Sequence, residues 1–312
     1  MEPVTPSPPL AKRRPGRDAL STKPGRDVML ALGRYRLLTT FQLNRLLYAN
    51  RSPTFVYTNL AKLGRAGYAT DDNWVSLRAT GAPRKLWGLT YRGAVALARE
   101  GVEDVAIPHH RARRSTATLE HLHDLNDVMI TCELFGTRCE GVDLLGWRHD
   151  DELHRHPMVV ELPDGSVTQL VPDGWVAYGI GRQSACLAVE TDRAFESERQ
   201  WRAKVRAYVA CLAGDPSPYR RVFGRENLVV LTVIRPKEIA RVKSPEGRLA
   251  ELKGWTEREL EALDKLKWGG LFRFTTQRAE ETEPRAFFAD ATWTTPFVEG
   301  CRPLLGGEPE VA

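Results

Sequence analysis

The chain has few of the features that mark secreted, membrane-spanning or nucleotide-binding proteins. Its five cysteines are scattered without a Cys-x-x-Cys pair, which favours reduced thiols and a cytoplasmic location. No apolar run approaches the roughly 18 residues that a membrane span needs. The first residues are basic and proline-rich without an apolar core, so no secretory signal is predicted. A glycine-rich phosphate loop is also missing, so neither a nucleotide nor an organic cofactor is expected.

The net charge of +5 hides an uneven distribution along the chain. Residues 1–115 contain 20 Lys and Arg against 8 Asp and Glu, or +12, and residues 116–312 contain 25 against 32, or −7. A strongly basic third is typical of proteins that bind a polyanion, most often nucleic acid. A solvated basic face without a ligand is the plainer alternative. The length favours two domains, at about 150 residues each.

The basic third has the pattern of three helices, a short hairpin and a closing helix. Apolar spacing predicts a first helix over residues 28–35, and a second that starts at the Thr39-Thr40 cap and ends at Tyr48. Ser52-Pro53 is a start signal for the third helix. On this helix the apolar face carries Val56, Leu60 and Leu63. The opposite face carries Thr54, Thr58, Lys62 and Arg65, with Tyr57 on the flank.

Two motifs in this region resemble those of winged helix-turn-helix modules: Leu-x-x-Leu-x-x-Ala-Gly-Tyr from Leu60 to Tyr68, and Trp-x-Leu-Thr-x-x-Gly from Trp87 to Gly93. The resemblance implies that the third helix enters the major groove of double-stranded DNA and that the wing contacts phosphates. The DNA-binding residues that it implies are Arg51, Thr54, Tyr57, Thr58, Lys62, Arg78, Arg84 and Lys85. The alternatives are that the threonines are only solvated, that Tyr57 packs, or that the module docks a protein.

The predicted organisation divides the chain into five segments. These are a disordered basic arm over 1–24, a winged helix domain over 25–102, a linker over 103–117, a second domain over 118–300 and a flexible tail over 301–312. The linker carries the basic cluster Arg111, Arg113 and Arg114, which suits either a phosphate backbone or a plain hinge.

The second domain has the pattern of a helix, several strands, a helix and a further strand. Asp164-Gly165 is a hairpin signal between strands. The predicted helices are 119–135, 196–212 and 256–266, and the predicted strands are 142–147, 158–162, 167–171, 174–180, 185–191, 228–234 and 271–274. This order resembles the restriction-endonuclease-like, PD-(D/E)xK fold. The whole chain is then α+β, with a winged helix-turn-helix followed by an α/β domain around a central mixed sheet.

Carboxylates are expected to meet at one end of this sheet. If 174–180 pairs with 185–191 through the turn at 181–183, Asp173 comes close to Glu190 and Asp192. Carboxylates at one sheet end repel each other unless a cation is present, and Mg²⁺ prefers such oxygen ligands. The alternative is neutralisation by basic side chains, for which Arg182, Arg193 and Lys204 are available.

The PD-(D/E)xK resemblance gives these residues roles. Pro172-Asp173 stands at the PD position and Glu190-Thr191-Asp192 at the (D/E)xK position, which implies Asp173 and Glu190 as ligands of Mg²⁺ in an active nuclease. Asp192 replaces the lysine that active members usually carry, which puts catalysis in doubt. If the site is catalytic, Asp192 assists the reaction, and Lys204 on the following helix supplies the positive charge at the scissile phosphate. Lys204 either faces the carboxylates or extends past the edge of its helix into solvent. The first is favoured, because Arg202 and Arg206 are expected to occupy the solvent face of that helix.

The layout over most of the chain is similar to the replication-relaxation family of plasmid and mobile-element proteins. The similarity rests on the winged helix, a helix with His121 and Asn126-Asp127, a run from Pro172 to Tyr178, Val-Glu-x-Asp-Arg from Val189, and Trp-x-x-Lys-x-x-x-Tyr from Trp201. His121 and His123 face apart on their helix, so zinc is not expected. His121 is instead a candidate for lining the nuclease-like site.

The resemblance implies a DNA-binding protein in plasmid replication, relaxation or transfer, and it leaves three hypotheses open. The first is a metal-dependent DNA nickase. The second is a non-catalytic regulator of transcription or replication, whose degenerate nuclease fold is a scaffold for homodimerisation or docking. The third is an adaptor that binds a relaxase or replication proteins.

Overall fold

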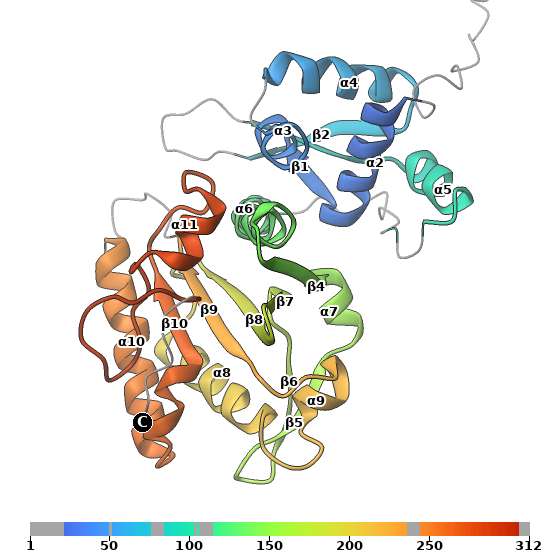
Figure 1. The fold of residues 1–312 in the computed structure, drawn as a ribbon. Coiled ribbons are helices and arrows are strands. Elements are labelled where there is room, and N and C mark those ends of the chain that lie inside the picture. Colours follow the sequence, from blue (N-terminus) through green and yellow to red (C-terminus); the bar gives the residue numbers. More distant parts are fainter. Residues whose placement is uncertain are drawn as a thin grey trace, which may run out of the picture. The chain divides into compact units, whose positions relative to one another are not determined.

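The computed structural model describes residues 22–49, 52–75, 84–102, 105, 115–235 and 244–305. These residues form two compact units (Figure 1). One contains the described residues up to Trp74 and from Lys85 to 105, and the other contains chiefly those from 115 onward. Arg51, Arg78 and the basic cluster of the predicted linker lie outside the described residues.

The first unit combines four helices with a three-stranded sheet. Its elements are α2 (Lys23–Tyr35), β1 (Leu37–Thr39), α3 (Thr40–Tyr48), α4 (Pro53–Arg65), β2 (Ala69–Val75), β3 (Arg84–Leu89) and α5 (Tyr91–Arg99), with strand order β1-β3-β2. The predicted order of helices and hairpin is observed. The short strand β1 was not predicted, because three residues are too few for a periodic pattern. The winged helix-turn-helix assignment itself stays a prediction.

Local sequence signals explain how these helices begin. Helix α3 starts at a capping box, in which Thr39 Oγ1 accepts from the Gln42 N–H at 3.1 Å and Gln42 Oε1 accepts from the Thr39 N–H at 3.0 Å. The predicted cap at Thr39 is therefore confirmed. The predicted faces of α4 are confirmed as well, because its apolar stripe is buried and its polar stripe is exposed. The polar side chains of α4 therefore do not pack into the core of their own unit.

The second unit is built around a five-stranded mixed sheet of order β10-β9-β8-β7-β4. The strands are β4 (Val142–His149), β7 (Gly174–Ile180), β8 (Gln183–Asp192), β9 (Val229–Ile234) and β10 (Phe272–Thr275), and β5 (Met158–Glu161) and β6 (Val167–Leu170) form a separate hairpin. Strand β8 pairs antiparallel with β7 and parallel with β9. The predicted mixed α/β architecture with a central mixed sheet is confirmed.

Helices cover both faces of this sheet (Figure 1). They are α6 (Thr116–Arg138), α7 (Asp150–Arg155), α8 (Glu198–Cys211), α9 (Pro218–Phe223), α10 (Pro245–Ala262) and α11 (Pro284–Ala289). On one face Tyr178 of β7 donates to the Cys132 carbonyl of α6 at 2.9 Å. On the other, Trp175 and Ala177 belong to a core that includes Trp201 and Tyr208 of α8. None of the described helices is both long enough and apolar enough to span a membrane.

The predicted antiparallel pairing of β7 with β8 is observed, but the turn between them is tighter than predicted, because β8 already starts at Gln183. Gly174 pairs with Val189 and Ile180 with Gln183, so a tight turn joins β7 to β8. Because Asp173 directly precedes β7, it lies beside the end of β8 that carries Glu190. The hairpin predicted at Asp164-Gly165 is also observed, with Glu161 opposite Val167.

The prediction was wrong for the helix placed at 256–266, which is α10 and starts at Pro245. Ser244 Oγ caps it by accepting from the Gly247 N–H at 3.1 Å, and Leu266 belongs to a separate 3-10 turn. The Ser-Pro start signal was missed because the first turns of this helix lack a clear apolar stripe. The short helices α7, α9 and α11 were missed too, because six residues carry too little periodicity.

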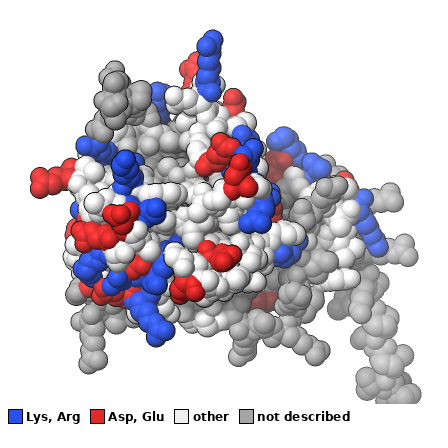
Figure 2. Space-filling model, turned by 90° about the horizontal axis from the view of Figure 1, so that it is seen from below, with Lys and Arg blue, Asp and Glu red and all other residues white. Residues whose placement is uncertain are grey.

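Charge on the second unit is mixed. On the face seen in Figure 2, positive and negative side chains alternate around an area of uncharged residues. This agrees with the near balance of 25 basic and 32 acidic residues after residue 115. Among its described residues, this face therefore shows no single basic surface of the kind that marks a nucleic-acid interface.

Candidate active site

Seven ionisable residues of the second unit line one small cavity of about 190 Å³, and five of them, from five segments, are the focus of the candidate site. They are His121 of α6, Asp173 before β7, Glu190 of β8, Glu196 in the β8–α8 loop and Lys204 of α8. The β7–β8 register brings the first two carboxylates to one sheet end, and α8 packs across that end. The sequence-predicted residues Asp173, Glu190 and Lys204 are therefore brought together.

Glu190 is buried, with 2% of its surface exposed. Its Oε2 accepts from Lys204 Nζ at 3.1 Å, and its Oε1 accepts from the Tyr208 hydroxyl at 2.5 Å. Burial raises the pKa of Glu190 to about 7, against the opposing effect of Lys204. Burial and the Glu190 carboxylate also raise the pKa of Tyr208, so that hydroxyl stays a hydrogen-bond donor. Glu190 can thus gain or lose a proton near neutral pH.

Lys204 faces the carboxylates, as predicted. Its Nζ lies 3.1 Å from Glu190 Oε2 and 2.6 Å from Glu196 Oε1. Burial acts to lower the pKa of Lys204, but the two carboxylates raise it overall, so the side chain stays charged. The predicted reason for this orientation, that Arg202 and Arg206 occupy the solvent face of the helix, was wrong. Arg202 and Arg206 do not simply occupy a solvent face, because both pair with Glu259 of α10, at 2.7 and 2.9 Å.

Asp173 and His121 form an ion pair in the same cavity. Asp173 Oδ2 accepts from the Thr191 N–H at 2.8 Å, and Oδ1 lies 3.3 Å from His121 Nε2. Burial acts to raise the pKa of Asp173, but His121 and Lys204 lower it overall. Burial likewise acts to lower the pKa of His121, but Asp173 raises it to about 9. The imidazole is therefore protonated at neutral pH.

Asp192, predicted to assist catalysis, is engaged elsewhere. It is 5% exposed, and its two oxygens accept from Arg248 of α10, at 2.9 Å from Nε and 2.8 Å from Nη2. Its Oδ2 also accepts from the Ala194 N–H at 3.0 Å. Asp192 still borders the cavity, so its catalytic role stays a prediction, although its lone pairs are largely used.

The cavity carries one more carboxylate than cations. Asp173, Glu190 and Glu196 face His121 and Lys204, while Asp192 and Arg193 at the rim pair with residues outside the cavity. A hard divalent cation, which prefers carboxylate oxygens, would balance the extra charge. The carboxylate oxygens are the ligand type that Mg²⁺ prefers, and the assignment of Asp173 and Glu190 as its ligands stays a prediction.

The model of the replication-relaxation family matches residues 30–225. This chain belongs to the replication-relaxation family. The match contains the five residues of the candidate site and ends before α10, which supplies Arg248. Membership suggests a role in plasmid or mobile-element replication or relaxation, and it implies involvement with DNA and the replication machinery. No curated protein and no solved structure matches the chain.

Another acid–histidine group lies within α6 of this replication-relaxation protein. His123, Asp124 and Asp127 have potential ligand atoms within 4.8 Å of one another. However, Asp124 is already 3.2 Å from Arg193 Nε and 3.7 Å from Arg235 Nη2. The arginines supply the positive charge that a metal ion would otherwise bring, so this group is a structural network.

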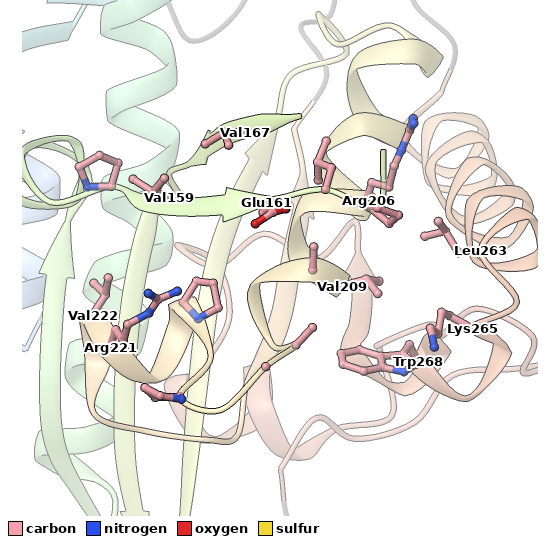
Figure 3. A pocket seen from close by; sticks show the side chains of 18 of the residues that line it. Val159, Glu161, Val167, Arg206, Val209, Arg221, Val222, Leu263, Lys265 and Trp268 are labelled. Atoms are coloured by element: carbon pink, nitrogen blue, oxygen red, sulfur yellow. The ribbon is translucent and has the colours of Figure 1, made fainter. Parts of the chain in front are cut away.

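A larger hollow of about 1270 Å³ lies elsewhere on the second unit (Figure 3). Figure 3 shows Val159 and Glu161 of β5 on one wall, with Val209, Arg221 and Trp268 around it. Most of its lining is apolar, and Glu161 is its one carboxylate among the described lining residues. Its other charged lining residues are Arg206, Arg221 and Lys265. With a single carboxylate it offers fewer groups for acid–base or metal chemistry than the small cavity at Glu190, which is the better candidate in this family member.

The His121–Asp173 pair predicts a pH-dependent contribution to stability. The pKa of His121 is about 9 in the folded protein and about 6.5 when unfolded, so folding binds its proton more tightly. Its contribution is fully present below pH 6.5 and is lost as pH rises through 9. We expect His121→Gln to lower Tm by about 2–4 °C at pH 6, with the difference disappearing by pH 10, since partial exposure screens the pair to about 1 kcal/mol.

Thermal unfolding of wild type and variant between pH 6 and 10 measures this effect. His156→Gln, at an exposed histidine in the same unit, controls for the substitution. A Tm difference that is the same at every pH would show that the ion pair does not form.

Proposed function

We propose that this protein binds double-stranded DNA and nicks it by metal-dependent hydrolysis of a phosphodiester bond. The observation that carries the proposal is the position of Lys204 Nζ, 3.1 Å from Glu190, in the cavity that Asp173 also lines. Two carboxylates and a lysine are the residues that PD-(D/E)xK nucleases use. Here the lysine comes from α8 instead of from the strand position that Asp192 occupies.

Four residues of the cavity have distinct parts in the proposed reaction. Asp173 and Glu190 would hold Mg²⁺, which when bound lowers the pKa of its water and neutralises charge on phosphate oxygens. Lys204 stabilises the negative charge that develops on the scissile phosphate. Hydrolysis forms a bond from a water oxygen to phosphorus, with the water proton released to solvent, and breaks the bond from phosphorus to one sugar oxygen, which takes up a proton. His121 suits that donation, because its raised pKa of about 9 keeps it protonated at neutral pH.

We further assign DNA recognition to α4 in the first unit. Thr54, Tyr57, Thr58 and Lys62 are all exposed on one side of the helix. Arg84 on β3 is exposed too, and it suits a phosphate contact. Lys85 is a weaker candidate than its neighbour, because its Nζ is bound to Asp71 at 2.5 Å. The basic composition of this third of the chain, +12 over residues 1–115 (20 Lys and Arg against 8 Asp and Glu), supports the assignment.

Salt dependence of DNA binding tests the recognition helix. If Lys62 contacts a phosphate, Lys62→Ala should weaken binding to any sequence and reduce the slope of log K against log salt by about 1. Lys85→Ala should have a smaller effect, because Asp71 already neutralises that charge. Fluorescence anisotropy of a labelled duplex between 50 and 200 mM salt measures both.

Lys265→Ala, which removes an exposed charge from the second unit, is the matched control and should leave the slope unchanged. Wild-type binding that is absent, or that does not vary with salt, would contradict DNA binding through phosphates.

One observation favours the non-catalytic regulator as a second candidate function. Lys204 is bonded to both Glu190 and Glu196, and Asp192 stands where active nucleases carry lysine. A site of this kind can be retained as a structural ion-pair network while the fold supports dimerisation or partner docking. Tight DNA binding without nicking in either Mg²⁺ or Mn²⁺ would support this function. Recovery of a relaxase without DNA would instead support the adaptor hypothesis.

A further inference from the structure

An aromatic side chain stands in solvent at the mouth of the candidate active site. Phe195 lines the cavity together with its neighbour Glu196, yet it is 66% exposed. It is the most exposed phenylalanine or tyrosine among the described residues. Burying a phenylalanine side chain yields about 1.5–3 kcal/mol, so a ring held in water beside a reactive site needs an explanation.

Hydrogen bonds hold the backbone of the loop on both sides of Phe195. Ala194 has φ 60°, a left-handed conformation that costs a non-glycine residue about 1–2 kcal/mol. Its N–H donates to Asp192 Oδ2 at 3.0 Å, and Arg248 holds the same carboxylate. Arg248 Nη2 also donates to the Glu196 carbonyl at 2.9 Å. One buried arginine thus fixes the residues on either side of Phe195.

A second arginine sets the orientation of the ring. The Arg193 guanidinium lies 5.8 Å from the centre of the Phe195 ring. It is itself anchored, with Nη2 2.8 Å from Glu120 and Nε 3.2 Å from Asp124. The ring is therefore placed on a rigid support and extends outward from the loop.

We propose that Phe195 is a stacking platform for an unpaired nucleobase next to the scissile phosphate. Every base offers a flat π face, and stacking on an aromatic side chain is worth about 1–3 kcal/mol per base without a sequence requirement. In an intact duplex those faces are covered by neighbouring base pairs. The substrate class is then DNA with an unpaired or opened nucleotide at the cleavage position, as at a single-strand junction. This inference rests on the proposed function, because it places DNA at the Glu190 cavity.

Binding of three DNAs to the full chain in EDTA tests the platform without cleavage. The probes are one labelled oligonucleotide as a single strand, as a perfect duplex and as a duplex with a short central gap. Phe195→Ala should weaken binding to the single strand and the gapped duplex about 5- to 150-fold, and change duplex binding less than about twofold. Phe195→Trp should retain binding, and its indole fluorescence should be quenched by the single strand.

Phe297→Ala is the matched control, because Phe297 is also exposed, at 42%, but does not line the cavity. Equal losses on all three DNAs, or no loss, would overturn the platform; if wild type still nicks, the proposed function stands. Selective loss in Phe195→Ala with no nicking by wild type would support the platform and overturn the nuclease. Wild type that binds none of the three DNAs would overturn both.

Discussion

Metal-dependent nicking of supercoiled plasmid is expected to fall by about 10³-fold or more in Asp173→Asn and in Glu190→Gln. Each substitution keeps the shape of the side chain but removes a negative oxygen that Mg²⁺ needs, and a bound metal ion supplies several kcal/mol of transition-state stabilisation. Both residues line the same cavity beside Lys204. Neither residue lies in the first unit, so DNA binding through α4 should persist in both variants.

Conversion of supercoiled to open-circular plasmid on a gel, with Mg²⁺ or Mn²⁺, measures the effect. Glu161→Gln is the control, since it removes a carboxylate of the larger hollow and should leave nicking unchanged. The nicking rate should also rise with pH through about 7, because a metal ligand must be ionised and burial raises the pKa of Glu190 to about 7. Variants that bind DNA and nick as fast as wild type would refute the assignment of the site.

Arg248→Met, which removes the ion pair with Asp192, is expected to lower the free energy of unfolding of the second unit by about 3–5 kcal/mol. The side chain of Asp192 is 2% exposed and that of Arg248 5% exposed, so removing the arginine leaves a buried charge without its partner. The same substitution releases the Glu196 carbonyl and the loop that carries Phe195. Urea unfolding of wild type and variant measures the loss.

Arg258→Met is a matched control, because Arg258 lies on the same helix as Arg248. Its ion pair with Glu198 of α8 is half exposed, so its loss should cost less than about 1 kcal/mol. The double variant Arg248→Met with Asp192→Asn should recover part of the stability, since no unpaired charge then remains. Equal losses in the buried and exposed pairs would show that Asp192 is not held by Arg248, which would return it to consideration as a catalytic group.

The carboxylate pair was predictable because it depends on local geometry. A tight turn at Gly181-Arg182 joins β7 to β8, so the antiparallel pairing that brings Asp173 close to Glu190 follows from a turn signal and two neighbouring strands. The 3.6-residue period likewise placed Lys204 among the buried residues Trp201, Val205 and Tyr208. These patterns involve residues within about twenty to forty positions of one another, so few alternative arrangements compete with the observed one.

The partner of each carboxylate was decided only by the tertiary structure. Arg193 was a candidate to neutralise Glu190 and Asp192, but it binds Glu120 on α6, 73 residues earlier. Arg248 was not considered for Asp192, 56 residues away, and the start of its helix was misplaced. Tyr208 was recognised as apolar packing, and its hydroxyl bond to Glu190 was missed.

The sequence by itself determined the mixed α/β fold, the family, the hairpins and the approach of Asp173 to Glu190. The sequence also made His121 a candidate for this site, but the tertiary structure alone placed Glu196 and the exposed Phe195 at that sheet end and paired Asp192 with Arg248 of α10. The physical reason is that strand alternation, turns and helix faces are encoded by neighbouring residues. Ion pairs and cavity walls join elements far apart in the chain, and several charged residues compete for each position until packing selects one.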